Sequence, residues 1–161
     1  MPRPVPRPRP PGRARRGAAA VEFAVVVPLL LLFLLGIVEV GRLVMVGQLA
    51  TNGSREAARY AVQGSADPAA VEAYTRQYLA QTGIPDAAVT DFSIEAYTTT
   101  TSIKGAVATG WNPAPTLSAV PQGTPIRARF QIDYDRVSWL PTRFVIGLGT
   151  RVPGVCVMRK E

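Results

Sequence analysis

Residues 13–23 read RARRGAAAVEF, and the next fifteen residues, 24–38, carry no charge. One acid, Glu22, thus lies inside an apolar stretch that follows a basic run and a glycine. A lone carboxylate in a bilayer costs on the order of 2.5–3.5 kcal/mol on insertion scales, so such acids tend to be paired or functional. If a peptidase cuts after Gly17, the new ammonium at Ala18 lies one helical turn before Glu22. The stretch therefore indicates a processed subunit that assembles in a membrane.

The positive charge is concentrated at the N-terminus. The chain has 161 residues and a formal net charge of +7. Residues 1–16 hold six arginines and no acid, a charge of +6, whereas the rest has twelve basic and eleven acidic side chains, a net +1. No aromatic residues interleave this basic arm and no recognition helix follows it, so we expect it to set membrane topology rather than to bind nucleic acid.

The composition excludes several kinds of catalytic site. The chain has no histidine, which removes His-based metal sites, Ser-His-Asp triads and Cys-His dyads. Its single cysteine, Cys156, cannot form an intrachain disulfide, and we interpret it as a small buried residue. Asp133 and Asp135 share the predicted solvent-facing side of a strand, where carboxylates are normally solvated. We expect no enzyme, no cofactor, no metal and no small-molecule substrate.

Residues 18–40 predict a single transmembrane helix. The segment contains two charges, Glu22 and Glu39, and its length of about 34 Å suffices to cross a hydrocarbon core of about 30 Å. A cleaved secretory signal is the alternative, but this apolar region exceeds the usual length of about 7–15 residues and no A-x-A site follows it. The preceding arginines place the N-terminus in the cytoplasm and everything after Glu39 outside it.

Two further features modify this helix. Pro28 lies within the span and predicts a kink, which has both a packing and a functional interpretation. Glu39 and Arg42, three residues apart, are expected to pair on one helix face at the outer interface, as snorkelling groups often do.

The helix is predicted to continue past the membrane to about Gln63-Gly64. Residues 43–62 contain no proline, and apolar or small residues recur at three- and four-residue steps. Gly53 weakens a helix by up to about 1 kcal/mol relative to alanine, which would allow a bend there. A helix this long is more than an anchor, so its upper half must pack on a domain.

A second helix is predicted directly after the first. Asp67 suits the N-cap and Pro68 the first helical position, while Gly83 and Pro85 end the helix. Its predicted apolar stripe consists of Val71, Tyr74, Tyr78 and Leu79.

Three or four antiparallel strands follow. Residues 126–135 alternate strictly between apolar and polar, and residues 89–97 and 151–159 predict further strands, the last broken by Pro153-Gly154. The other segments are predicted as a hairpin around Lys104-Gly105 with a long loop, in residues 98–125, and as a short helix or strand, in residues 140–148. The fold class is therefore α+β, with the two helices covering the apolar face of a small sheet.

These predictions divide the chain into three parts. Residues 1–17 form a basic, Pro- and Arg-rich cytoplasmic leader, and residues 18–63 form the long helix, with its transmembrane part at about 18–40 and its extension at 41–63. Residues 64–161 form the extracytoplasmic domain.

Gly17 and Glu22, between a basic leader and an apolar helix, resemble the processing site of type IV-related prepilins. More specifically, the chain resembles the TadE-like pseudopilins of tight-adherence (Tad/Flp) pilus systems. The resembling segments are residues 16–23, Pro28 with its leucine run, residues 36–42, residues 51–61 and the ending 157–161.

The resemblance implies a pilin-like, minor subunit that builds or primes a pilus or a related secretion apparatus and serves adhesion or secretion. Gly17 would precede the cut by a prepilin peptidase, and Ala18 would become the N-terminus. Glu22 would meet the terminal ammonium of a neighbouring subunit, and Phe23 would complete the Glu-aromatic pair. The implied partners are the membrane, the peptidase, other pilins or pseudopilins and Tad assembly proteins. The alternative is an uncleaved, membrane-tethered binding module of an envelope complex.

Overall fold

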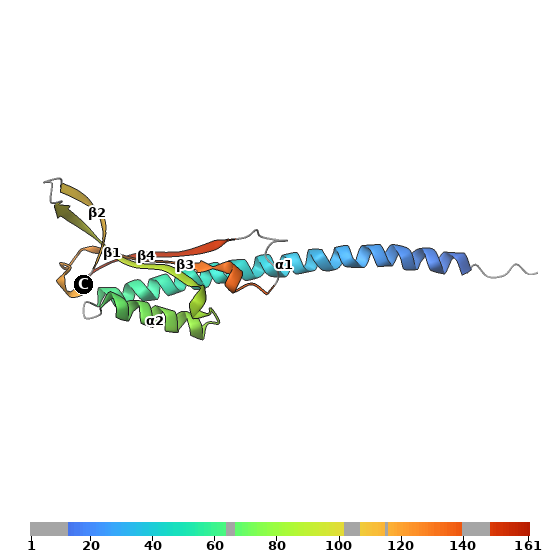
Figure 1. Ribbon diagram of the computed structural model, residues 1–161, viewed down its shortest axis with the longest axis horizontal. Helices are drawn as coiled ribbons and strands as arrows, with labels where there is room; N and C mark the ends of the chain where they lie inside the picture. The colour runs from blue at the N-terminus through green and yellow to red at the C-terminus, as the bar shows by residue number, and fades with distance from the viewer. Residues whose placement is uncertain (1–12, 64–66, 102–106, 115, 140–148) are drawn as a thin grey trace, which may run out of the picture. The chain divides into compact units, whose positions relative to one another are not determined.

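The structure, a computed structural model, describes residues 13–63, 67–101, 107–114, 116–139 and 149–161. Its elements in chain order are α1 (Arg13–Val62), α2 (Pro68–Gln81), η1 (Asp86–Ala88), β1 (Val89–Thr101), β2 (Val107–Pro113), η2 (Leu117–Ala119), β3 (Pro125–Asp133), η3 (Tyr134–Arg136) and β4 (Arg151–Arg159). Two helices thus precede an antiparallel sheet, and the predicted α+β class is confirmed (Figure 1). The predicted turn at Lys104-Gly105, the predicted element at 140–148 and residues 1–12 of the leader lie outside the described residues.

The long helix α1 runs without interruption through Pro28 and Gly53. From Gly17 onward it contains an 18-residue window with a mean hydropathy of 2.8, so it is long and apolar enough to cross a membrane. Apart from the half-buried Val27, its large apolar side chains from Val21 to Val40 are exposed, as expected for a surface that lipid covers. The helix indicates a single-pass membrane anchor. The kink at Pro28 stays a prediction.

The chain divides into two compact units, Met1–Val38 and Glu39–Glu161. The second unit contains α2, the sheet and residues 39–62 of α1, which we call the upper part of this helix. Its core has two clusters of buried residues, and both combine side chains of α1 with side chains of β1 and β3. The upper part of the long helix is therefore a structural element of the domain.

Short side chains form the face of α1 that packs on the domain. The buried residues on this face are Val46, Ala50, Gly53, Ser54, Ala57, Ala58, Ala61 and Val62. A Cβ added at Gly53 would lie 2.9 Å from Leu79 Cδ2 of α2 and 3.2 Å from Phe130 Cζ of β3. Packing, rather than a bend, accounts for this glycine, because α2 and the sheet approach the helix backbone there.

The second helix begins and ends as predicted. Asp67 is the N-cap, Pro68 opens α2, and Gly83 follows the helix with a φ of +89°. The buried face differs slightly from the predicted stripe, since Val71, Thr75 and Leu79 are its fully buried members. Thr75 tolerates burial because its hydroxyl donates to the carbonyl of Val71 at 2.7 Å.

The sheet has the strand order β2-β1-β3-β4, and each neighbouring pair is antiparallel. The alternation predicted for residues 126–135 is confirmed, because its apolar members are fully buried: Ile126, Ala128, Phe130, Ile132 and Tyr134. β3 itself ends at Asp133, and Tyr134 opens η3 while keeping its place in the core. Helix α2 and the upper part of α1 cover this face of the sheet (Figure 1).

The predicted break at Pro153-Gly154 is wrong. β4 runs unbroken from Arg151 to Arg159 and pairs with β3 along its whole length. β4 is the last strand in the order, and an edge strand tolerates proline because one of its sides forms no ladder hydrogen bonds. Gly154 is required by packing, since a Cβ there would lie 2.6 Å from the carbonyl oxygen of Ala50 in α1. Both residues are thus explained by their neighbours in space.

We expect Gly154→Ala to lower the free energy of unfolding by about 1–3 kcal/mol, because the added methyl group overlaps the helix backbone. Gly110→Ala in β2 is the matched control, since nothing lies within 4 Å of an added Cβ there, and its effect should stay within about 0.5 kcal/mol. Urea unfolding of the full chain in detergent measures both. Equal unfolding midpoints for the two variants would contradict the close contact between α1 and β4.

Candidate functional site

The predicted site residues all lie on α1 but belong to two units. Gly17, Ala18, Glu22, Phe23 and Pro28 fall in the unit that ends at Val38. Glu39 and Arg42 fall in the unit that carries the sheet. Each group is therefore described by itself.

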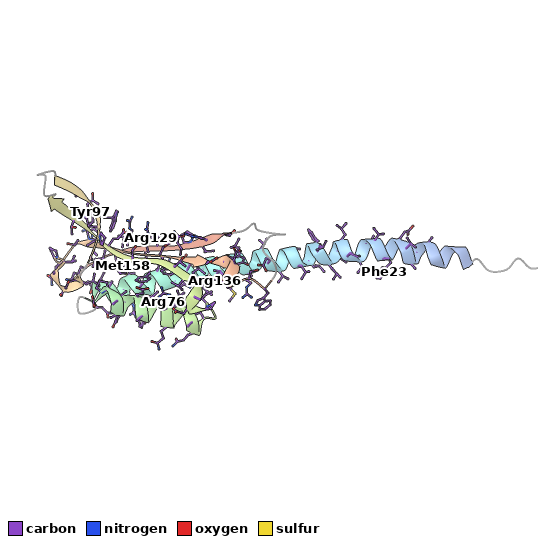
Figure 2. All side chains as sticks on the ribbon, in the orientation of Figure 1. Phe23, Arg76, Tyr97, Arg129, Arg136 and Met158 are labelled. Atoms are coloured by element: carbon purple, nitrogen blue, oxygen red, sulfur yellow. The ribbon has the colours of Figure 1, made fainter. Side chains whose placement is uncertain are left out.

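The N-terminal group lies on an exposed helix surface. Gly17, Ala18 and Glu22 are exposed. Phe23, labelled in Figure 2, keeps 69% of its surface accessible. Nothing lies within 4 Å of a Cβ added at Gly17. Ala18 and Glu22 are four residues apart in the helix, so they are neighbours on its surface. Glu22 and the predicted new N-terminus at Ala18 thus lie on the same face of an exposed, apolar helix.

Glu39 has a different environment, because it is buried with 1% of its surface exposed. Its Oε1 accepts a hydrogen bond from the hydroxyl of Tyr134 at 2.9 Å and another from the hydroxyl of Ser138. The Tyr134 hydroxyl also lies 3.2 Å from the backbone oxygen of Glu39. We call Glu39, Tyr134 and Ser138 the Glu39 cluster. It ties α1 to a segment that lies 95 to 99 residues further along the chain.

Arg42 contacts the same segment from the next turn of α1. Its Nε donates to the carbonyl oxygen of Val137 at 3.0 Å, and its guanidinium carbon lies 4.3 Å from the ring centroid of Trp139. A Glu39–Arg42 pair does not occur among the ion pairs of the described residues. The two residues instead make separate contacts. Glu39 accepts hydrogen bonds from two hydroxyl groups, whereas Arg42 donates to a backbone carbonyl and packs on an indole ring.

Burial raises the pKa of Tyr134 to about 12, and the hydrogen bond to Glu39 and the negative charge of that carboxylate add to the increase. The neutral hydroxyl is the form that donates, so Tyr134 keeps its contact with Glu39 throughout the neutral pH range. The Glu39 cluster is thus a buried acid held by two hydroxyl donors. Within the described ranges no group of three or more His, Cys, Asp or Glu is placed to hold a metal.

The residues that bind Glu39 and Arg42 were not predicted as site residues. Tyr134 ended an alternating apolar pattern and was assigned to the core, where it lies, but its hydroxyl partner was not foreseen. Trp139 is 81% exposed, and such a ring close in sequence to Arg136 is a usable signal for an interaction surface. Nothing in the sequence joins Ser138 to Glu39.

The family comparison concerns the long helix. Residues 17–59 match the family model described as TadE-like protein. This segment is TadE-like. The match contains every predicted site residue and confirms the resemblance over this part of the chain, whereas Tyr134 and Ser138 lie outside the TadE-like segment. The TadE-like family is a structural, pilus-associated one, which favours a structural role over a catalytic one. Comparisons with curated proteins and with solved structures found no match.

We expect Tyr134→Phe to lower the free energy of unfolding by about 1–3 kcal/mol near neutral pH, because Glu39 loses a buried donor. The pKa of Tyr134 is about 12 in the folded chain, and about 10 is usual for an unfolded chain. Its stabilising contribution is therefore complete below about pH 10 and is lost as the pH rises through about 12.

Urea unfolding of the wild-type protein and of Tyr134→Phe, from neutral pH to above about pH 12, measures the difference in their free energies of unfolding. Tyr97→Phe is the control, since Tyr97 is 45% exposed and should show a much smaller effect. A wild-type advantage that persisted unchanged above about pH 12 would contradict the assignment.

Proposed function

We propose that this chain is a minor pseudopilin-type subunit that builds or primes a Tad (Flp) pilus or a related secretion apparatus. A prepilin peptidase cuts it after Gly17, and other pilins or pseudopilins are its partners in assembly. The supporting observation is the TadE-like segment, in which Glu22 lies exposed one turn after Ala18 on an apolar helix. The N-terminus is cytoplasmic and the domain from Glu39 is extracytoplasmic.

The electrostatics of the acid support this role. A free α-amino group has a pKa of about 7.7–8.0 in model compounds, so a new terminus at Ala18 would be cationic at neutral pH. In an apolar environment its attraction to the Glu22 carboxylate is much stronger than in water, although desolvation offsets much of the gain. Such a pair fixes the register between subunits more than it adds stability. Because Glu22 is exposed in the single chain, it is available to the terminus of a neighbour.

Processing has a local structural requirement. α1 begins at Arg13, so the Gly17–Ala18 peptide bond lies in the first turns of the helix. A protease needs extended backbone at the bond that it cuts, and glycine lowers the cost of unwinding a helix end. Among the described residues, nothing lies within 4 Å of a Cβ added at Gly17, so this position is sterically open.

One observation favours the alternative of an uncleaved, membrane-tethered binding module. The face of the sheet opposite the helices carries partly exposed apolar residues, since Tyr97, Val155 and Val157 keep 45%, 49% and 49% of their surfaces accessible. Arg129 is exposed on the same face (Figure 2). A surface of this kind suits a protein partner. The N-terminus of the mature protein separates the two functions, because only the pseudopilin starts at Ala18.

We expect N-terminal sequencing of the membrane-extracted protein to give Ala18 when the prepilin peptidase is present and Met1 when it is absent. Gly17→Leu should leave the protein at full length even with the peptidase, because the side chain blocks the position before the cut. Gly36→Leu is the matched control, since a Cβ at either glycine meets nothing within 4 Å, and this variant should still be cut. A wild-type protein that keeps Met1 beside an active peptidase would refute processing.

We expect Glu22→Gln to reduce surface pili about tenfold or more, which corresponds to about 1.4 kcal/mol or more of lost assembly free energy. Membrane insertion should be unchanged, because the amide carries no charge into the bilayer. Pilus yield and protease accessibility of the C-terminal domain measure the two effects. Val25→Leu, at another exposed position of the same helix, is the control. Normal pilus yield from Glu22→Gln would exclude the proposed role of the acid.

A further inference from the structure

An open groove lies beside Arg42 in the unit that begins at Glu39. Its walls come from α1, from the loop between α2 and η1, and from residues 136–139, and its volume is about 460 Å³. Arg42, Arg136 and Trp139 supply its charge and its aromatic surface. We call it the Arg-Trp groove. It is large enough to accept a phosphate-bearing group with its attached glycerol.

Trp139 is the most exposed large apolar side chain of the described residues, with 81% of its surface accessible. An indole that packs on a guanidinium and otherwise faces solvent is typical of the interface between a membrane and water, where the ring and its N–H find different environments. Arg42 lies over this ring at 4.3 Å. The groove therefore presents an amphipathic ring and a cation together.

Most donors of the two arginines form no hydrogen bond with the residues that the structure describes. Arg42 uses Nε for the carbonyl of Val137, and its terminal nitrogens form no hydrogen bond with any described residue. Arg136, labelled in Figure 2, has 57% of its side chain exposed, and its Nε donates to Asp133 Oδ2 at 3.3 Å. The acids close to these arginines include Asp133, Asp135 and Glu39. Asp135 Oδ2 accepts a hydrogen bond from the backbone N–H of Gly149, and Glu39 is buried and bonded to hydroxyl groups. The groove thus has cationic donors that the described part of the chain leaves unpaired, and such donors suit phosphate oxygens.

The position of Arg42 in the chain indicates what these donors meet. Val38 and Val40 are 58% and 51% exposed apolar residues at the end of the predicted span. Arg42 follows Val40 by two residues, a rise of about 3 Å along a helix. Arginine and tryptophan at this distance from a hydrocarbon core lie at the level of the lipid headgroups.

We propose that the Arg-Trp groove binds the headgroup layer of the bilayer that holds the anchor, with Trp139 in the interface and Arg42 and Arg136 on the phosphates of anionic phospholipids. The proposal rests on the membrane anchor alone and holds whether or not the chain is cut or enters a pilus. Binding would hold the segment from Tyr134 to Trp139 at the membrane surface. Removal of the subunit from the bilayer would then require the release of these lipid contacts.

Tryptophan fluorescence of the full chain in lipid nanodiscs tests this. The chain has two tryptophans, so Trp111→Phe isolates Trp139 and Trp139→Phe isolates Trp111. Trp111 contacts Arg127, which lies at the opposite end of β3 from Tyr134, and serves as the reference. With phospholipids brominated high in the acyl chain, we expect Trp139 to be quenched at least threefold more than Trp111. Equal weak quenching would overturn the proposal, as would a Trp139 shielded from acrylamide but not quenched by bromolipid, since a protein would then cover it.

The lipid charge gives a second measurement. In nanodiscs of phosphatidylcholine with phosphatidylglycerol, quenching of Trp139 should exceed that in phosphatidylcholine alone, and Arg42→Gln or Arg136→Gln should each reduce this difference at least twofold. Arg136→Gln leaves the contact between Arg42 and Val137 intact, so it separates lipid binding from local folding. Arg129→Gln, an exposed arginine on the open face of the sheet, should retain the difference. No dependence on phosphatidylglycerol, or an equal loss in Arg129→Gln, would overturn the role of the two arginines.

Discussion

Close contact between the backbone of α1 and strand β4 sets how the domain is built. A Cβ at Gly154 would lie 2.6 Å from the carbonyl oxygen of Ala50, and one at Gly53 would lie 2.9 Å from Leu79. Side chains on the buried face of α1 are short, so Phe130 fills the remaining space between helix and sheet. Because interiors are packed to the density of organic crystals, larger residues on this face would force the elements apart. One helix can therefore be both the anchor and the central element of the core.

Glu22 and Glu39 of α1 illustrate how a carboxylate is accommodated on the apolar part of a helix. Glu39 is satisfied within its own chain, by the hydroxyls of Tyr134 and Ser138, and it is buried. Glu22 is exposed and lies among apolar side chains that are also exposed. The first acid stabilises the fold of the single chain, whereas the second is exposed and suited to a contact with another chain. This difference is the physical basis of the proposed assembly role.

Hydroxyl donors at Glu39 also decide what Arg42 can do. A carboxylate that accepts hydrogen bonds from Tyr134 and Ser138 does not require an arginine as its partner. Arg42 instead packs over Trp139 and keeps its terminal nitrogens free toward the described residues. The polar end of the anchor thus contains a closed cluster around an acid and an open groove around a base. The first supports the fold, and the second faces outward.

The sequence by itself determined the features that depend on neighbouring residues. The length of the apolar run predicted α1, Asp67-Pro68 predicted the start of α2, and strict alternation predicted β3 with its buried face. Only the tertiary structure decided that Pro153 belongs to an unbroken edge strand, that Gly154 admits the helix, and that Glu39 binds Tyr134 across 95 residues. Helical and strand periodicity arise from repeated local geometry, so both can be predicted from the order of residues along the chain. Contacts between distant segments have no period, and they form only once packing has brought those segments together.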